Sequence, residues 1–260
     1  MTQVPLSDRV NREAEHGRVI LATDESNWGW STPAGQIRRQ RRADFLTKGF
    51  SGLPPRPKVL EVGCGSGTFT TDISQAFDDL VSIDVSEVLL EAARAKCPKV
   101  RFEKADIHQT AFKDGSFDLV VGCSVLHHLA WDVALREIGR LLRPGGQLRF
   151  SEPNLLNPQI YVQKNWSWLK RRLGDSPDEY AFTPGQIRSS LERAGFEDIA
   201  VKPFEFLHPH VPRPLIESVI GLEAWLERTP VRWIAGSIKI SAQRGATDTR
   251  PRTQPTRPRS

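Results

Sequence analysis

The chain has 260 residues, of which 38% are hydrophobic and 26% are charged, and this length and balance are typical of one globular α/β domain. Its net charge of +5 is concentrated at the end, because residues 244–260 contain five arginines and one aspartate (+4) and leave about +1 for the preceding residues. The composition therefore argues against a broad basic surface for nucleic acid, and three cysteines are too few for a disulfide framework.

The N-terminal part, residues 1–55, is predicted to form a helical flap or cap. The start of the chain lacks the apolar core of a signal peptide, and no apolar run approaches the length that spans a bilayer, so we expect a cytoplasmic protein. Trp28 and Trp30 either pack against the rest of the protein or form part of a flap that closes over a ligand. Helical spacing over 34–46 places Arg41 one turn from apolar residues on the same face.

From residue 58 onward, short apolar runs alternate with helical patterns. The strand candidates are 58–63, 79–84, 100–105, 117–122 and 147–152, followed by 198–206 and 232–242. Several are nearly continuous apolar runs, as expected of strands buried on both faces. Pro144, Gly145 and Gly146 are expected to end the helix that precedes the fifth strand. This alternation predicts an α/β fold, with a parallel sheet covered by helices on both faces.

After the fifth strand candidate, strand and helix patterns no longer alternate regularly. Thr183 and Gln186 form the pattern of a capping box, with Pro184 at the first helical position and Gly195 at the end of the helix. Apolar residues then recur along one face of a further predicted helix: Leu215, Ile216, Val219, Ile220, Leu222, Trp225 and Leu226. Residues 244–260 contain almost no apolar side chains, so we expect a disordered basic tail.

The stretch VLEVGCGSGTFT places Gly63, Gly65 and Gly67 directly after the first strand candidate. A strand that enters a glycine-rich turn and then a helix brings bare N–H groups and a positive helix end close to an anionic ligand. The third glycine comes one place too early for the G-x-G-x-x-G dinucleotide motif, which speaks against a nicotinamide dehydrogenase. On the glycines alone, a tight structural turn is an adequate interpretation.

Two aspartates at later strand ends strengthen the interpretation of this loop as a ligand site. Asp84 ends the second strand candidate, where a carboxylate can accept hydrogen bonds from two ribose hydroxyls. Asp106 follows the third, where it could accept one from an adenine amino group. A single aspartate after a strand is more often a helix cap or turn residue. Three such features at successive strand ends indicate a shared nucleotide-like ligand.

The motifs VLEVGCGSGTFT, SIDVSE, KADIHQTAF, FDLVVGCSVLHHL, LLRPGGQLRFSEP and FTPGQIRSSLERAGF resemble, in order and spacing, those of class I S-adenosylmethionine-dependent methyltransferases of the small-molecule type. The resemblance implies a Rossmann-like domain over 56–243, with insertions at 153–182 and 207–231. It implies a seven-stranded, mostly parallel sheet whose last strand is antiparallel, and S-adenosyl-L-methionine as the cofactor. The implied cofactor-binding residues are Arg41, Glu61, Gly63, Cys64, Gly65, Gly67, Asp84, Val85, Asp106, Ile107 and Cys123.

Methyl transfer to a hydroxyl requires that the acceptor atom is held close to the methyl group and loses its proton. His127 and His128 follow the fourth strand candidate, where the resemblance puts acceptor-side residues, and Glu152 ends the fifth in the same cleft. We therefore predict catalytic roles for all three. For either histidine alone, capping or packing under the following helix is an equally good interpretation, and Glu152 could instead form a structural ion pair.

The resemblance predicts an enzyme that methylates a hydroxyl, or less readily an amine, of a small or lipid-linked metabolite such as a sugar or natural product. Residues 157–182 interleave aromatic and basic side chains, which fits a lid over the acceptor or a segment on a membrane surface. A homodimer interface or additional core explains them equally well. The alternative functions are a non-catalytic module that binds S-adenosylmethionine or S-adenosylhomocysteine, and an RNA methyltransferase. No metal-ligand spacing is visible, so we predict no metal site.

Overall fold

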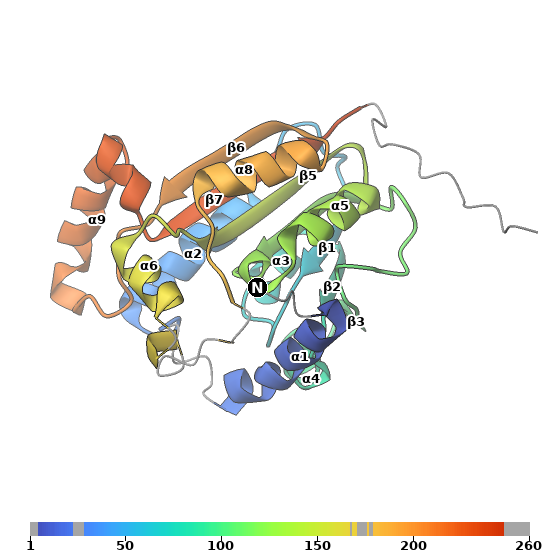
Figure 1. The fold of residues 1–260 in the computed structure, drawn as a ribbon, viewed down its shortest axis with the longest axis horizontal. Coiled ribbons are helices and arrows are strands. Elements are labelled where there is room, and N and C mark those ends of the chain that lie inside the picture. The colour runs from blue at the N-terminus through green and yellow to red at the C-terminus, as the bar shows by residue number, and fades with distance from the viewer. Residues whose placement is uncertain (1–4, 23–28, 167, 171–175, 177–178, 247–260) are drawn as a thin grey trace, which may run out of the picture.

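The protein is built around a central β-sheet (Figure 1). The computed structural model describes residues 5–22, 29–166, 168–170, 176 and 179–246, and within these the sheet has seven strands in the order β3-β2-β1-β4-β5-β7-β6. The strands are β1 (Lys58–Val62), β2 (Asp79–Asp84), β3 (Arg101–Lys104), β4 (Phe117–Cys123), β5 (Leu142–Pro153), β6 (Phe196–Phe204) and β7 (Ser237–Arg244). Neighbours from β3 to β5 pair in parallel, whereas β7 pairs antiparallel with both β5 and β6. The predicted sheet with an antiparallel last strand is confirmed.

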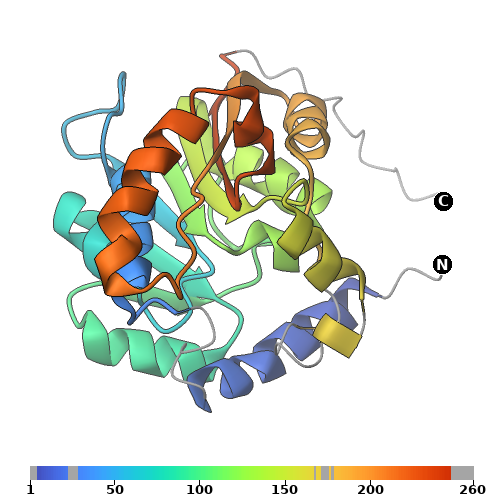
Figure 2. The same cartoon turned by 90° about the vertical axis from the view of Figure 1, so that its left-hand side faces the viewer.

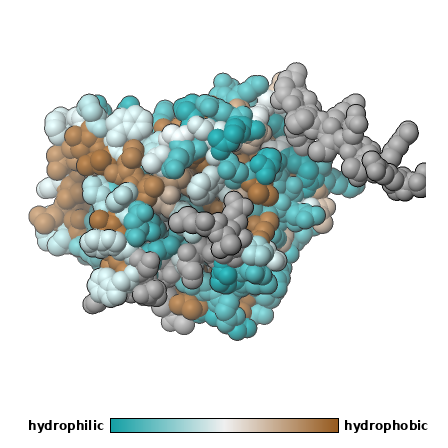
Figure 3. Space-filling view, in the orientation of Figure 1, coloured by the Kyte–Doolittle hydropathy of each residue, from teal (hydrophilic) through white to brown (hydrophobic). Residues whose placement is uncertain are grey.

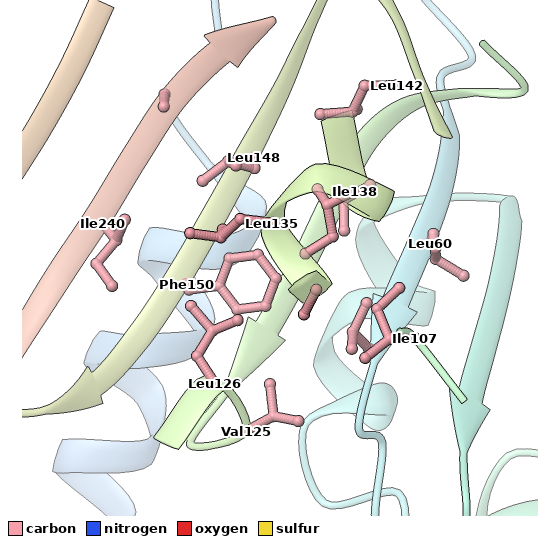
Figure 4. Packing of buried hydrophobic residues seen from close by; sticks show 14 of the residues in the cluster. Leu60, Ile107, Val125, Leu126, Leu135, Ile138, Leu142, Leu148, Phe150 and Ile240 are labelled. Carbon is pink, nitrogen blue, oxygen red and sulfur yellow. The ribbon is translucent and has the colours of Figure 1, made fainter. Parts of the chain in front are cut away.

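Helices cover both faces of the sheet, as predicted. They are α1 (Leu6–Ala22), α2 (Pro33–Thr47), α3 (Thr70–Ala76), α4 (Glu87–Lys96), α5 (Trp131–Leu141), α6 (Pro158–Asn165), α8 (Pro184–Arg193) and α9 (Ile216–Leu226). Leu135 of α5 and Ile187 of α8 belong to one buried cluster, whereas Leu46 of α2 and Ile73 of α3 belong to a second one. Figure 4 shows the first cluster, with Leu135 beside Phe150 of β5. Neighbouring residues of the central strands enter opposite clusters, which explains their continuous apolar runs.

Most strand boundaries lie within two residues of the prediction, and the starts of β5 and β7 differ most. The helix ends before Pro144, but β5 already begins at Leu142, and its pairing with β4 shifts register between Phe117 and Leu119. Gly145 and Gly146 therefore lie within an irregular strand start instead of a loop, as β-bulges allow. The last strand begins at Ser237, because residues 230–234 form a short 3₁₀ helix, η4 (Pro230–Ile234).

The two predicted later helices are present. The capping box of α8 is confirmed, since the Thr183 hydroxyl accepts the N–H of Gln186 and the Gln186 side chain accepts the N–H of Thr183. α9 is also present, but most of its predicted apolar stripe does not face the protein. Leu222 and Trp225 are more than half exposed, whereas Glu223 is buried. Only Ile216 and Val219 pack in a buried cluster, so most of the apolar stripe of this helix is not explained by the core of the protein.

The first N-terminal helix lies near the carboxyl end of β4, and the second crosses one face of the sheet. α1 packs against α4, and α2 packs against α3 and β5 (Figure 2). No helix in the described residues is long and apolar enough to cross a membrane. Trp28 and most of the predicted tail, residues 247–260, lie outside the described part of the chain.

Candidate active site

The loop after β1 forms one wall of the site. The N–H groups of Gly63 and Cys64 both donate to the carbonyl oxygen of Ile83, at 2.8 and 3.1 Å, and tie the loop to the end of β2. Gly63 has a φ of 67°, and a Cβ there would lie 2.2 Å from Cγ2 of Val125. Gly65 has a φ of 53°, but a Cβ there would meet no described atom within 4 Å. The loop is packed against protein at Gly63 and open at Gly65, as a loop that receives a ligand requires.

Glu61 lies in the sheet at the base of this loop. Its carboxylate accepts hydrogen bonds of 2.7 Å from the hydroxyls of Ser82 and Thr70, and burial raises its pKa to about 7. Because Thr70 begins α3, these bonds support the loop between β1 and α3. Cys64 is buried, which raises the pKa of its thiol, and Gly67 packs against α4. A direct contact of Glu61 with the methionine part of a cofactor stays a prediction.

Asp84 joins the loop to the end of β2. Oδ2 accepts the N–H of Gly65 and Oδ1 accepts the N–H of Ser86, each at 2.9 Å. Burial raises the pKa of Asp84, although these two donors favour the charged form. Each oxygen has a further lone pair for another donor, such as a ribose hydroxyl. Val85, predicted to lie beside the adenine ring, is half-buried next to this carboxylate.

Asp106 is held by a histidine that the sequence analysis overlooked. Nε2 of His108 accepts the N–H of Ala130, which leaves the proton on Nδ1, 2.5 Å from Oδ1 of Asp106. Burial alone would raise the pKa of Asp106, but the hydrogen bonds from His108 lower it overall. Ile107 is a core residue and is only 3% exposed (Figure 4). Any contact of Ile107 with an adenine edge would therefore fall to its backbone.

His127 is bracketed by two glutamates. Its Nδ1 lies 2.7 Å from Oε2 of Glu152, its Nε2 lies 3.3 Å from Oε1 of Glu179, and all three side chains are buried. The other oxygen of Glu152 accepts the N–H groups of Val125 and Leu126. Burial alone would lower the pKa of His127, but the two carboxylates raise it to about 9. At neutral pH the ring is protonated, which argues against the predicted use of His127 as a base.

His128 lies at the junction of the loop and the acceptor side. Its ring centroid is 4.2 Å from that of His127, and its Nδ1 is 3.0 Å from Oε2 of Glu13 in α1, although these two atoms are not aligned for a hydrogen bond. Arg9 of α1 donates a hydrogen bond of 2.8 Å to the backbone carbonyl of His128. α1 therefore holds the backbone of this histidine and places a carboxylate beside its ring.

One group of three side chains that could bind a metal is found within the described ranges. Ligand atoms of His127, His128 and Glu179 all lie within 4.8 Å of one another. However, the Lys164 ammonium bonds the Glu179 carboxylate, and His127 is itself protonated. Positive charge therefore already balances the carboxylate, as in a buried ion network. Glu13, Lys164 and Glu179 come from distant segments, and no local spacing identifies them in the sequence.

Arg41 does not face the glycine loop. It donates to Glu223 of α9 at 2.5 Å and to a second glutamate just after that helix, so its predicted pairing with the cofactor carboxylate is not supported. Arg42 is buried, pairs with Glu205, and donates weakly to Sγ of Cys123 at 3.9 Å. Burial raises the pKa of Cys123 to about 11, so this residue is a thiol at neutral pH.

Two other cations lie at the outer side of the glycine loop. Lys96 donates to the hydroxyl of Ser66 at 2.9 Å, and Arg39 donates to the carbonyl of Thr68 at 3.4 Å. They border a pocket of 510 Å³, and Trp30 belongs to its wall. The pocket is lined by Trp30, Ser31, Gln36, Arg39, Gln40, Thr68 and Lys96. Arg39 is already paired with Asp72 of α3, so Lys96 is better placed than Arg39 or Arg41 to attract an anionic group at this loop.

The sequence matches known methyltransferases. A family model described as a methyltransferase domain matches residues 60–150. A demethylmenaquinone methyltransferase of Beutenbergia cavernae is 30% identical over 169 residues, which are 62% of this chain and 69% of that protein. Another, of Mycolicibacterium paratuberculosis, is 30% identical over 63% of this chain and 73% of its own length. The chain belongs to the class I S-adenosylmethionine-dependent methyltransferases.

Solved methyltransferases share the fold. An S-adenosylmethionine-dependent methyltransferase of Thermotoga maritima, described as a possible histamine N-methyltransferase, has a TM-score of 0.63 at 18% identity and covers 87% of this chain and 96% of its own. Phosphoethanolamine N-methyltransferase 2 of Haemonchus contortus, solved with S-adenosyl-L-methionine, has a TM-score of 0.61 at 18% identity and covers 94% and 61%. The predicted enzyme class is confirmed, and the non-catalytic alternative has no support.

S-adenosylmethionine is the cofactor of this methyltransferase, and the loop residues fit it. Gly65 leaves an open backbone surface, Asp84 keeps lone pairs for ribose hydroxyls, and Lys96 lies where a carboxylate would be attracted. When bound, this cofactor supplies a methyl group on a positively charged sulfur.

Proposed function

We propose that this methyltransferase methylates a hydroxyl of a small or lipid-linked metabolite, with His128 as the general base. The observation that carries the proposal is the 3.0 Å approach of Nδ1 of His128 to Oε2 of Glu13 in α1. The two atoms are not aligned for a hydrogen bond, but the negative charge of a carboxylate this close favours the tautomer with its proton on Nδ1, so Nε2 is left to accept a proton from the acceptor. The relatives named for demethylmenaquinone support a small-molecule acceptor.

His127 has a positioning role in this proposal. Its imidazolium is held between Glu152 and Glu179, and with a pKa of about 9 it stays protonated at neutral pH. Glu152 also binds N–H groups at the start of the 3₁₀ helix η2 (Leu126–His128), and the N–H of Tyr180 donates to the carbonyl of His127 at 2.9 Å. These bonds fix the segment that carries His128, so Glu152 and His127 act through it instead of on the acceptor.

The preference for a hydroxyl follows from what a base contributes. A hydroxyl is a weak nucleophile until its proton is taken, so a histidine oriented by a carboxylate increases its reactivity. A neutral amine attacks without prior deprotonation, and the same pair would help it less. An amine acceptor therefore remains the second choice for this site.

The test is methyl transfer by His128→Gln. Release of S-adenosylhomocysteine is measured with a panel of small hydroxylated compounds and matched amines. We expect turnover on a hydroxyl acceptor to fall by about 10²- to 10⁴-fold, with little change in calorimetric binding of S-adenosylhomocysteine. His210→Gln, in an exposed loop, is the matched control and should keep full activity. Unchanged turnover by His128→Gln would contradict the assignment of His128 as the general base. Activity on amines alone would contradict a hydroxyl as the acceptor.

A further inference from the structure

A continuous apolar surface is exposed on α9 and η4. It consists of Leu215, Leu222, Trp225, Val231, Trp233 and Ile234, and we call it the apolar face. Its members are between 44% and 60% exposed, and α9 and η4 contact each other. In Figure 3 a hydrophobic area lies at the left, where Figure 1 shows α9. Contiguous exposed apolar patches of this kind mark interaction sites more often than chance exposure does.

α9 differs from an ordinary surface helix on its outer side. Its inward side buries Ile216 and carries Glu223, which with Glu227 just beyond the helix pairs with Arg41 of α2, while Leu222 and Trp225 point outward. A helix that faces water normally turns its charged residues outward and its apolar residues toward the core. Here the ion pairs anchor the helix from the inside. The outward residues therefore suit a medium that is less polar than water.

The charges around the apolar face are mainly positive. Arg213, Arg228 and Arg232 are exposed, and no carboxylate within the described ranges pairs with them. Arg232 lies over the ring of Trp233 at 5.7 Å. Glu217 is the one exposed carboxylate within α9. Two copies of this face brought together would oppose their arginines, whereas an anionic surface would pair with all three.

We propose that the apolar face docks on the interfacial region of a bilayer that contains anionic phospholipid. α9 has 11 residues and is too short to span a bilayer, so it would lie in the plane of the interface. Trp225 and Trp233 would sit at the headgroup boundary, where indole rings are favoured, and the arginines would contact lipid phosphates. This docking is independent of the proposed acceptor chemistry, because vesicle binding is measured without any acceptor.

The test uses the full chain and vesicles of phosphatidylcholine with and without phosphatidylglycerol. Brominated lipids quench tryptophan fluorescence only when the indole enters the bilayer, and the basic segment 244–260 contains no tryptophan. We expect quenching on phosphatidylglycerol vesicles, which is largely lost in Trp225→Phe/Trp233→Phe. Trp166→Phe/Trp168→Phe, which removes two exposed tryptophans of the preceding insertion, is the matched control and should retain it.

Two further variants test the affinity. Leu222→Ser/Trp225→Ser should bind vesicles at least about tenfold more weakly, whereas Val19→Ser, an exposed apolar site on α1, should bind as the unchanged chain does. Arg213→Gln/Arg228→Gln/Arg232→Gln should bind about a hundredfold more weakly, because each cation near an anionic surface strengthens binding roughly fivefold. Circular dichroism confirms that the variants are folded.

Three results would overturn the proposal. The first is no vesicle binding, and the second is sedimentation with vesicles without quenching, which would assign the binding to the basic end of the chain. The third is a lipid-free dimer, seen by sedimentation velocity, that Leu222→Ser/Trp225→Ser abolishes, which would assign the face to a second copy.

Discussion

The ion network around His127 predicts a pH-dependent stability that a single substitution removes. In the folded protein the pKa of His127 is about 9, against an ordinary value of 6.5 in the unfolded chain. A difference of about 2.5 between these values corresponds to roughly 3 kcal/mol of folding free energy. Because the folded pKa is the higher one, this contribution is fully present below the unfolded pKa of 6.5 and is lost as the pH rises through about 9.

The measurement compares urea unfolding of the unchanged chain and His127→Gln at about pH 6 and about pH 9.5. The unchanged chain should lose roughly 3 kcal/mol more than the variant between the two conditions, since the other titrating groups are common to both. Glu179→Gln removes one of the two carboxylates and should lower the pKa of His127, which an NMR titration of the ring would report directly. Equal pH dependence in the unchanged chain and in His127→Gln would refute this reasoning.

Three further predictions concern the loop and the buried ion pair. Asp84→Asn should weaken S-adenosylhomocysteine binding by at least about tenfold in calorimetry, because a charged acceptor for ribose hydroxyls is lost; unchanged affinity would contradict the ribose assignment. Gly63→Ala should lower the free energy of unfolding by about 2–4 kcal/mol, because the new Cβ would clash and the residue has a positive φ. Gly65→Ala should lower it by only about 1–2 kcal/mol and should also reduce cofactor affinity. Equal losses of stability in urea unfolding would show that the loop is not packed as described. Glu205→Gln should lower the free energy of unfolding by about 3–5 kcal/mol in the same assay, because it leaves the Arg42 guanidinium buried without its carboxylate. A decrease below about 1 kcal/mol would mean that water reaches this pair.

Most of the fold could be predicted because its signals are local. A strand buried on both faces needs a continuous apolar run, and a capping box needs Thr183 and Gln186 three residues apart. The errors occur where tertiary contacts override local preference. β5 begins before Pro144 because pairing with β4 tolerates a register shift, and Trp233 leaves β7 because η4 packs beside α9.

The candidate site could be predicted in part for the same reason. Gly65 and Asp84 follow strands whose ends meet at one edge of a parallel sheet, so chain order alone brings them together. Arg41 was placed by helical spacing, which identifies a face but not the partner that the face meets. Its partner is Glu223 on a helix far along the chain, and only folding brings the two together.

The sequence by itself determined the family, the alternation of strands and helices and the position of the cofactor loop, because these depend on residue spacing and on backbone conformations that favour glycine. The tertiary structure alone decided which groups are charged and which are available. Glu152 and Glu179 converge on His127 from separate segments and hold it protonated, while Glu13 reaches His128 from α1. A pKa depends on charges within a few ångströms, and distances between remote segments are set only when the chain is folded.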